Sequence, residues 1–552
     1  MTQSVEIWLN NFLSSYYRNR PVNATFIGVH DFDDRLPDFS KEGVDTLGNE
    51  MKDLLERSTK FSPTNKTETI DLSIGTNFLE IQLHELESLH FQKGNPATYS
   101  SEAIFGLISL CLRDFAPPAE RLNSMIKRME RIPDFLEIGE QSVGSAPQEW
   151  TREAARQCGG AIRFLKDGVK ILIEEWNAPR KLQEEAEKSA KAFSDYWTYL
   201  TSELIHHDRS DGYGCGGSFF TTLIRKGHFE DMDAEKVASY GWEHLEEYKE
   251  LLSRETKKLR QNGDWEPVIS SLAEKHPKTG DVLSTAQKYW EDCKSVATRR
   301  ELVTWPDYPI EYKFIPEIFR EAAPHLYFLY YRSPSPFDKV KMNYYLLPPV
   351  DVSMTAEEQE KRLRGVNYTA IKDNHVVHHG ALGHHIQNYY AYHSMGKLSK
   401  IASVDCASRI AMFCGGTMAE GWATYASDLM DEVGFNSPEE HIAHLHSKTR
   451  LTARAVVDAS LHAGQYSFDD AVKFYMEKVG MNLEAARSEV VKNSMFPATG
   501  SMYLLGNDGI HELREKVSRR QGGDFNLRRF HDEILSYGSV PVALIAKNVI
   551  GN

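Results

Sequence analysis

The chain of 552 residues carries 79 acidic and 64 basic side chains, giving a formal net charge of −15. This acidic balance repels polyanions and argues against nucleic acid as a partner. Apolar residues make up 41% of the sequence and charged residues 26%, as in globular proteins. Because the sequence has no run of 18 apolar residues, we also expect no membrane partner.

The six cysteines are scattered without a C-x-x-C pair, which predicts reduced thiols. One of them, Cys215, lies in the glycine-rich segment 212–217 and is interpreted as a loop cysteine rather than a nucleophile. The first eight residues lack the basic and apolar regions of a signal peptide. Together these features predict a cytoplasmic protein.

Apolar residues recur at helical spacing from the N-terminus onward. The first 30 residues carry this spacing, and residues 20–40 are predicted to lead through a polar turn to a helix N-cap at Ser40. His206, His207 and Asp208 are interpreted as a helix end rather than a metal site, because adjacent helical residues point about 100° apart. Further helices are predicted within 41–140, 147–205, 233–300 and 355–552.

Two aromatic, β-prone segments bounded by prolines, 307–316 and 341–349, are the best strand candidates. The overall prediction is therefore a mostly α protein with one small β patch. No linker is long or polar enough to separate domains, so we expect one helical domain over residues 1–552. A division of this domain into two lobes around a cleft is left open.

The most distinctive stretch is rich in histidine. Imidazole is the commonest side-chain metal ligand and needs no deprotonation near neutral pH. Glu420 follows in a largely apolar helical run, and many zinc hydrolases combine two histidines of one helix with a carboxylate from a later helix. Five of the chain's 21 histidines fall within eleven positions: His375, His378, His379, His384 and His385.

Helix geometry alone leaves three ligand pairings open. On a straight helix, residues four or seven apart share a face, which favours His375 with His379 and His378 with His385. His378 and His384 are six apart and share a face only where the helix bulges. Two glycines within the stretch permit such a bulge.

Several motifs, in the same order along the chain, resemble the DUF885 family. Residues 378–387, His-His-Gly-Ala-Leu-Gly-His-His-Ile-Gln, resemble its pattern His-Glu-x-x-Pro-Gly-His-His-Leu-Gln. That family resembles helical zinc metallopeptidases of the angiotensin-converting-enzyme and thimet-oligopeptidase kind, which implies a large metallopeptidase-like helical fold with a central cleft. The likeness covers most of the chain and includes residues 21–38, 420–426, 454–462, 530–535 and 538–541.

Carried over by position, the resemblance implies metal ligands at His378, His384 and Glu420. The metal is expected to be a divalent ion, with zinc preferred. The resemblance favours His384 over the adjacent His385, which requires a bulge near Gly383.

The resemblance also implies roles beyond the metal. Tyr503 matches a family tyrosine that is expected to donate a hydrogen bond to a developing oxyanion. Arg454 and His462 are expected to bind a substrate carboxylate or oxyanion. Structural pairing of these two residues with Asp458 and its neighbours is the alternative.

The chain departs from the family pattern at the expected general base. The glutamate after the first histidine is replaced by His379, and the acid seven residues after Glu420 is replaced by Ser427. Loss of a general base costs about 10²–10⁴ in rate. His379 is predicted to handle the proton instead, because imidazole titrates near neutral pH. A role for His379 as a further metal ligand is left open.

Three functions fit these observations. The first is a metal-dependent hydrolase acting on a small amide, ester or peptide-like substrate. The second is a metal-dependent lyase or oxygen-using enzyme on the same fold, and the third is a non-catalytic pseudoenzyme. The expected partner is a small molecule or short peptide, and the sequence names neither the substrate nor the oligomeric state.

Overall fold

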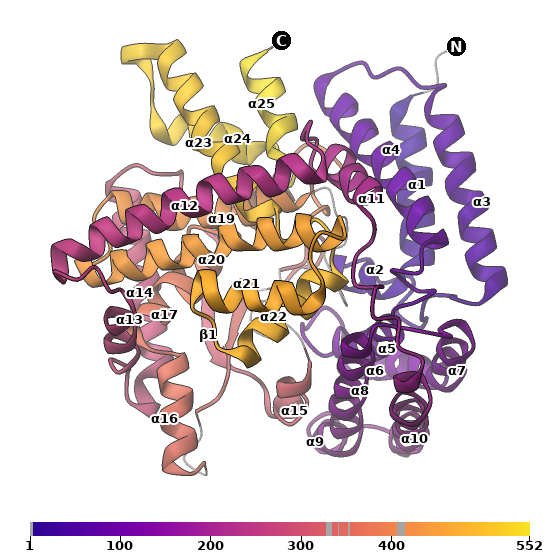
Figure 1. Ribbon diagram of the computed structural model, residues 1–552. Coiled ribbons are helices and arrows are strands. Elements are labelled where there is room, and N and C mark those ends of the chain that lie inside the picture. The colour runs from indigo at the N-terminus through magenta and orange to yellow at the C-terminus, as the bar shows by residue number, and fades with distance from the viewer. Residues whose placement is uncertain are drawn as a thin grey trace. The chain divides into compact units, whose positions relative to one another are not determined.

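The computed structural model describes residues 4–326, 334–340, 342–350, 354–404, 406 and 415–551 (Figure 1). Within these ranges it confirms a mostly α protein with one small β patch. No helix in these ranges combines the length and the apolar character needed to cross a bilayer. The single domain with a cleft stays a prediction. The chain forms two compact units, residues 1–215, 315–341 and 396–413 (unit 1) and residues 216–314, 342–395 and 414–552 (unit 2).

Unit 1 is built from helices that pack through their apolar faces. Its described helices are α1 (Val5–Asn19), α2 (Pro21–Ile27), α3 (Lys41–Ser58), α4 (Lys66–Glu87), α5 (Ala97–Ile108), α6 (Pro118–Met129), α7 (Ile132–Ser142), α8 (Gln148–Arg163), α9 (Val169–Trp176), α10 (Arg180–Ser202) and the short α15 (Glu317–Arg320). Helices α1, α3 and α4 pack together, and the Trp8 indole donates to the carbonyl of Leu54 at 2.8 Å (Figure 1).

The start of unit 1 confirms the sequence analysis and limits the extent of the predicted turn. Ser40 caps α3 as predicted, with its hydroxyl accepting from the N–H of Gly43 at 3.1 Å. The helical spacing predicted for the first 30 residues is confirmed by α1 and α2, and the polar turn within residues 20–40 is confined to the part after α2. Pro21 presets the backbone of the first helical turn, and Gly28 ends the helix in the left-handed region at φ 91°.

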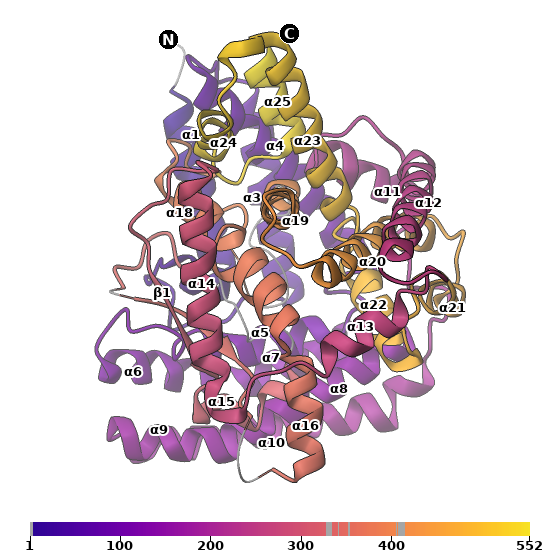
Figure 2. The ribbon, with the colours of Figure 1, turned by 90° about the vertical axis from the view of Figure 1, so that its left-hand side faces the viewer.

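Unit 2 holds every predicted site residue. Its described helices are α11 (Gly217–Thr222), α12 (Ala234–Leu259), α13 (Glu266–Ala273), α14 (Val282–Arg299), α16 (Ala356–Gly365), α17 (Tyr368–Ala370), η6 (Ile371–Gly380), α18 (His384–His393), α19 (Gly416–Glu432), α20 (Pro438–His462), α21 (Phe468–Val479), α22 (Leu483–Met495), α23 (Met502–Gln521), α24 (Leu527–Ser536) and α25 (Val542–Ile550). The long helices α12 and α20 run side by side (Figure 1), as do α23 and α25 (Figure 2).

The two strands form at the segments predicted for them. β1 (Ile310–Phe314) and β2 (Asn343–Leu347) pair in parallel, with Tyr312 opposite Tyr345. Both tyrosines are buried and reach the histidine stretch. The hydroxyl of Tyr312 donates to the carbonyl of His375 at 3.1 Å, and the Tyr345 hydroxyl lies 2.8 Å from His375 Nδ1. The small sheet therefore anchors η6.

Two glycines bring α19 and α23 into backbone contact. A Cβ on Gly421 would lie 2.4 Å from the carbonyl carbon of Gly506, and one on Gly506 would lie 2.0 Å from the carbonyl oxygen of Thr417. Only glycine permits this approach. Because Glu420 precedes Gly421 and Tyr503 lies one turn before Gly506, the contact brings these two side chains to one place.

Candidate functional site

The helix that carries the first histidines is a π-helix that ends in a sharp break. A turn of three residues separates η6 from α18. Within it, the N–H of Gly383 donates to the carbonyl of Val377 at 2.9 Å. A Cβ on Gly383 would lie 1.9 Å from the carbonyl oxygen of His378. The break returns the start of α18 toward the end of η6, and it is the bulge that pairing His378 with His384 requires.

Two indoles hold the carbonyl groups that the break leaves without helical partners. Trp290 Nε1 donates to the carbonyl of Gly380, and Trp422 Nε1 donates to the carbonyl of Leu382, each at 2.9 Å. Trp422 lies on α19, two residues after Glu420. The helix that supplies the acid therefore also supports the turn between the histidines.

Glu420 meets two histidines across this break. Its Oε2 lies 3.4 Å from Nε2 of His378 and 3.3 Å from Nε2 of His384. Neither contact has hydrogen-bond geometry, and Oε2 is buried without a hydrogen bond from the described residues. The two histidines are 14% and 12% exposed, so the group is reachable but largely shielded.

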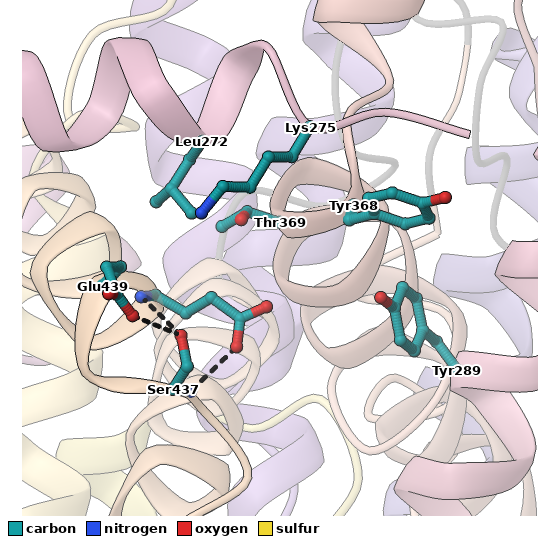
Figure 3. Close-up of a pocket in the computed structure, with 8 residues that line it drawn as sticks. Leu272, Lys275, Tyr289, Tyr368, Thr369, Ser437 and Glu439 are labelled. Atoms are coloured by element: carbon teal, nitrogen blue, oxygen red, sulfur yellow. Dashed lines mark hydrogen bonds between the residues drawn. The ribbon is translucent and has the colours of Figure 1, made fainter. Parts of the chain in front are cut away.

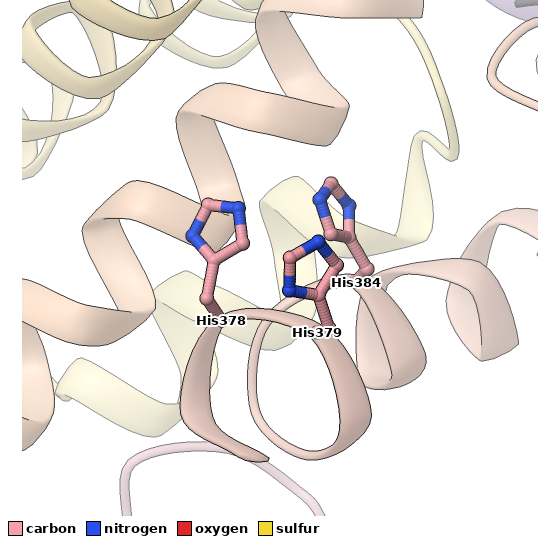
Figure 4. Close-up of side chains that lie close together, drawn as sticks. All are labelled: His378, His379 and His384. Carbon is pink, nitrogen blue, oxygen red and sulfur yellow. The ribbon is translucent and has the colours of Figure 1, made fainter. Parts of the chain in front are cut away.

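His379 completes a group of three imidazoles. One ligand nitrogen from each of His378, His379 and His384 lies within 4.8 Å of the other two. The three rings gather on the same side of the turn (Figure 4). Nδ1 of His379 donates to the carbonyl of Asn374 at 2.7 Å, which leaves the lone pair of the neutral ring on Nε2.

Burial and mutual contact set the charge of this group. Burial opposes ionisation of Glu420, but His384 and His378 outweigh it and hold the pKa of the carboxyl well below its ordinary value. Burial, together with His378 and His384, lowers the pKa of His379 well below its ordinary value, so the expectation that this imidazole titrates near neutral pH was wrong. Glu420 is therefore a carboxylate and His379 a neutral imidazole at neutral pH. Both are in the form that binds a cation.

The other two histidines of the cluster are turned to structural partners. Nε2 of His385 lies 2.8 Å from the carbonyl of Tyr308, and the His385 ring stacks on the Tyr308 ring at 4.4 Å. His375 contacts Tyr345 of the sheet. Burial lowers the pKa of both imidazoles to about 4. The structure thus brings His384, and not His385, to Glu420.

Tyr503 lies beside the carboxylate. Burial raises the pKa of its phenol well above the ordinary value, and the negative charge of Glu420 raises it further. Tyr503 is therefore protonated over the whole physiological range. It presents an O–H donor next to the histidine group.

Arg454 is committed to a carboxylate partner on another helix. Its Nε and Nη2 donate to the two oxygens of Glu489 at 2.6 and 3.1 Å. The guanidinium carbon also lies 4.9 Å from the centroid of the Tyr503 ring. The predicted alternative partner, Asp458, was wrong for Arg454. Asp458 instead accepts from the N–H of Ser501 at 2.8 Å.

His462 is fully buried, away from solvent. Its Nε2 donates to the carbonyl of Asn493 at 3.0 Å, and Asp458 Oδ1 lies 3.6 Å away. Burial lowers the pKa of this imidazole to about 4. These contacts favour the structural alternative for His462 over a substrate contact.

Two further cations, which the sequence analysis did not identify, belong to this region. Arg450 lies one helical turn before Arg454 on α20, and Lys492 lies on α22. Lys492 interacts electrostatically with both Arg454 and Glu420. The i, i+4 spacing of the two arginines was a readable signal, because it places them on one helix face. Nothing local in the sequence indicated Lys492.

A separate small pocket of about 270 Å³ lies elsewhere in unit 2 (Figure 3). It is bounded partly by the capping box of α20, in which Ser437 and Glu440 bond to each other's backbone. None of the predicted site residues lines it. Its lining consists of Leu272, Lys275, Tyr289, Tyr368, Thr369, Ser437, Glu439 and Glu440.

Comparison with known proteins agrees with the fold. Residues 21–549 match the family described as "Bacterial protein of unknown function (DUF885)". A candidate lipoprotein of unknown function from Shewanella oneidensis is similar in structure, with a TM-score of 0.80, 21% identity and full coverage of both chains. A candidate lipoprotein from Colwellia psychrerythraea has a TM-score of 0.77 at 15% identity, covering 100% of this chain and 99% of that one. No curated protein matches the chain.

Proposed function

We propose that this chain, which belongs to the DUF885 family of bacterial proteins of unknown function, is a metal-dependent hydrolase. Its substrate is a small amide, ester or peptide-like molecule. The observation that carries the proposal is the buried Oε2 of Glu420, which faces two imidazole nitrogens at 3.3 and 3.4 Å without a hydrogen bond. The likeness to helical metallopeptidases that the motifs suggested is part of the same proposal.

The spacing of these atoms suits a bound cation. Nitrogen and oxygen ligands about 2.0–2.1 Å from a tetrahedral zinc ion lie about 3.3 Å from one another. A buried carboxylate oxygen without a donor is costly unless it coordinates an ion. His378, His384 and Glu420 would therefore hold a divalent metal, preferably zinc. When bound, such an ion polarises a carbonyl and lowers the pKa of a bound water.

The chain's own residues supply the remaining chemistry. His379, held in one tautomer by the Asn374 carbonyl, accepts a proton at Nε2. The protonated phenol of Tyr503 donates a hydrogen bond to the oxygen that becomes negative during attack on a carbonyl. Arg454 acts through Tyr503, because its guanidinium lies over the phenol ring and is fixed there by Glu489.

Metal analysis of the purified full-length protein tests the proposal. We expect the protein to bind one equivalent of divalent metal. His378→Ala and Glu420→Gln are each expected to lower the metal affinity by at least about 100-fold. This loss exceeds the 10–100-fold that is typical of residues that only support the ligands. His393→Ala is the matched control, because this histidine follows the cluster and, within the described part of the chain, contacts Tyr389 through the carbonyl at 2.7 Å and through its ring. Unchanged metal content in His378→Ala would overturn the site.

The second candidate function is a metal-dependent lyase or oxygen-using enzyme. It is favoured by the third imidazole, because a histidine-rich set also suits copper, nickel and iron. Optical and electron paramagnetic resonance spectra of protein that took up its metal in the producing cells separate the two functions, because they show whether the ion is redox-active. If the purified protein contains no metal and chelation does not change it, the remaining function is that of a non-catalytic binder.

The cytoplasm is the proposed location. Among the described cysteines, Cys111, Cys158 and Cys293 are free thiols, which suits a reducing compartment. The two similar structures come from candidate lipoproteins, so export is the competing location. Fractionation of producing cells, with the protein recovered from the membrane or the periplasm, would refute the cytoplasmic location.

A further inference from the structure

Arg450 is a cation without a hydrogen-bond partner among the described residues. It lies on α20, its Nε is buried, and its guanidinium makes no hydrogen bond or ion pair with the described residues. Burial and the neighbouring Arg454 lower its pKa. A buried guanidinium nitrogen without an acceptor costs free energy, because its lost hydration is not replaced. An anion bound at this nitrogen would remove that cost.

Arg450 belongs to the same region as the histidine group. Among its electrostatic neighbours are Arg454, Glu489 and Tyr503, and Tyr503 interacts electrostatically with Glu420. Lys492 on α22 interacts with both Arg450 and Glu420. The phenol and the lysine thus connect the unpartnered guanidinium with the proposed metal ligands.

The charges of this region do not balance. Arg450, Arg454 and Lys492 contribute three positive charges. Glu489 is hydrogen-bonded to Arg454 and also attracts Arg450 electrostatically, and Glu420 faces the imidazoles. Among these five described groups one positive charge remains in excess, and Arg450 offers a planar group that binds carboxylates through two parallel hydrogen bonds.

We propose that Arg450 binds a free carboxylate of the substrate, with Lys492 contributing charge. The substrate class is then an N-acyl amino acid or a short peptide whose scissile bond lies near its free carboxyl terminus. This inference rests on the proposed hydrolase function for the identity of the scissile bond, but the anion site itself does not require it. Arg454, the residue suggested by the motif, is a positioning residue for Tyr503.

Calorimetric titration of the full chain with N-acetyl-alanine and with N-acetyl-alanine amide tests the site. Wild-type protein is expected to bind the acid at least about tenfold more tightly than the amide. Arg450→Met is expected to lose this preference, and Arg450→Lys is expected to retain part of it. Arg519→Met removes an exposed arginine of α23 that pairs with Glu515 and is expected to keep the full preference. Thermal unfolding of Arg450→Met at or above the wild-type temperature shows that the variant is folded.

Equal binding of acid and amide by the wild type, or an unchanged preference in Arg450→Met, would overturn the carboxylate site. Tighter binding of inorganic phosphate than of N-acetyl-alanine would also overturn it in favour of a phosphate site. Titrations with zinc-loaded and metal-stripped protein separate this inference from the function. A preference that persists in protein without hydrolytic activity supports the anion site while the hydrolase proposal fails.

Discussion

Gly383 packs directly against the backbone of His378, so that a Cβ on the glycine would meet the histidine's carbonyl oxygen at 1.9 Å. This contact closes the break between η6 and α18. The position of His384 relative to Glu420 therefore depends on the absence of a side chain one residue earlier.

Gly383→Ala is accordingly expected to damage the site. Because the clash is with backbone, η6 and α18 must move apart, at a cost of about 1–3 kcal/mol in the free energy of unfolding. We expect metal affinity to fall together with stability, as measured by urea denaturation and by metal titration. Gly365→Ala is the control, since a Cβ there meets nothing within 4 Å. Normal metal binding in Gly383→Ala would show that the break does not position the ligands.

The role of His379 can be separated from that of the ligands. His379→Ala is expected to keep its bound metal while kcat falls by about 10²–10⁴, the usual contribution of a general acid or base. Metal content and single-turnover rates with an N-acyl amino acid measure the two effects. A parallel loss of metal would instead assign His379 to the coordination sphere, and full activity would remove it from the mechanism.

Local sequence patterns predicted the helices and the sheet but not the ligand geometry. The strand segments around Tyr312 and Tyr345 were recognisable because prolines bound short aromatic runs. Helical periodicity misjudged the pairing of His378, because a π-helix changes the number of residues per turn and the chain then breaks at Gly383. The motif resemblance, which carries no assumption of a straight helix, singled out His384.

Contacts between distant segments were beyond the sequence analysis. Glu489 lies 35 residues after Arg454, and no local pattern indicates that they meet. Pairing with Asp458 and its neighbours was the alternative drawn from the sequence, whereas the carboxylate that Arg454 contacts belongs to Glu489 on α22. Arg450 was overlooked for the same reason, since the absence of a partner can be recognised only in three dimensions.

Arg454 and Arg450 are expected to respond oppositely to substitution. Arg454→Met leaves the Glu489 carboxylate buried without its partner, and breaking a buried ion pair costs about 3–5 kcal/mol. Arg450→Met removes a guanidinium that has no partner, so its free energy of unfolding is expected to equal or exceed that of the wild type. Urea denaturation of both variants measures the difference. Equal destabilisation by the two substitutions would contradict the assignment of Arg450 as unpartnered.

His30 makes the stability of unit 1 depend on pH. Its two ring nitrogens lie 2.8 Å from Asp33 and 2.8 Å from Asp338. Burial lowers the pKa of His30, but hydrogen bonds to the two carboxylates outweigh it and raise the pKa from 6.5 to about 9. The protonated imidazole is therefore favoured in the folded chain more than in the unfolded chain.

This linkage fixes the sign of the pH dependence. The contribution of His30 is complete below pH 6.5 and is lost as the pH rises through about 9. Because the His30 ring is partly exposed, we expect it to contribute about 1–2 kcal/mol to the free energy of unfolding rather than the full Coulombic value. Urea denaturation at pH 6.5 and 9.5 measures how much the free energy of unfolding falls between the two values. His30→Gln should abolish this fall. His206→Gln, which replaces an exposed histidine, should leave it intact. An identical pH dependence in wild type and His30→Gln would assign it to other groups.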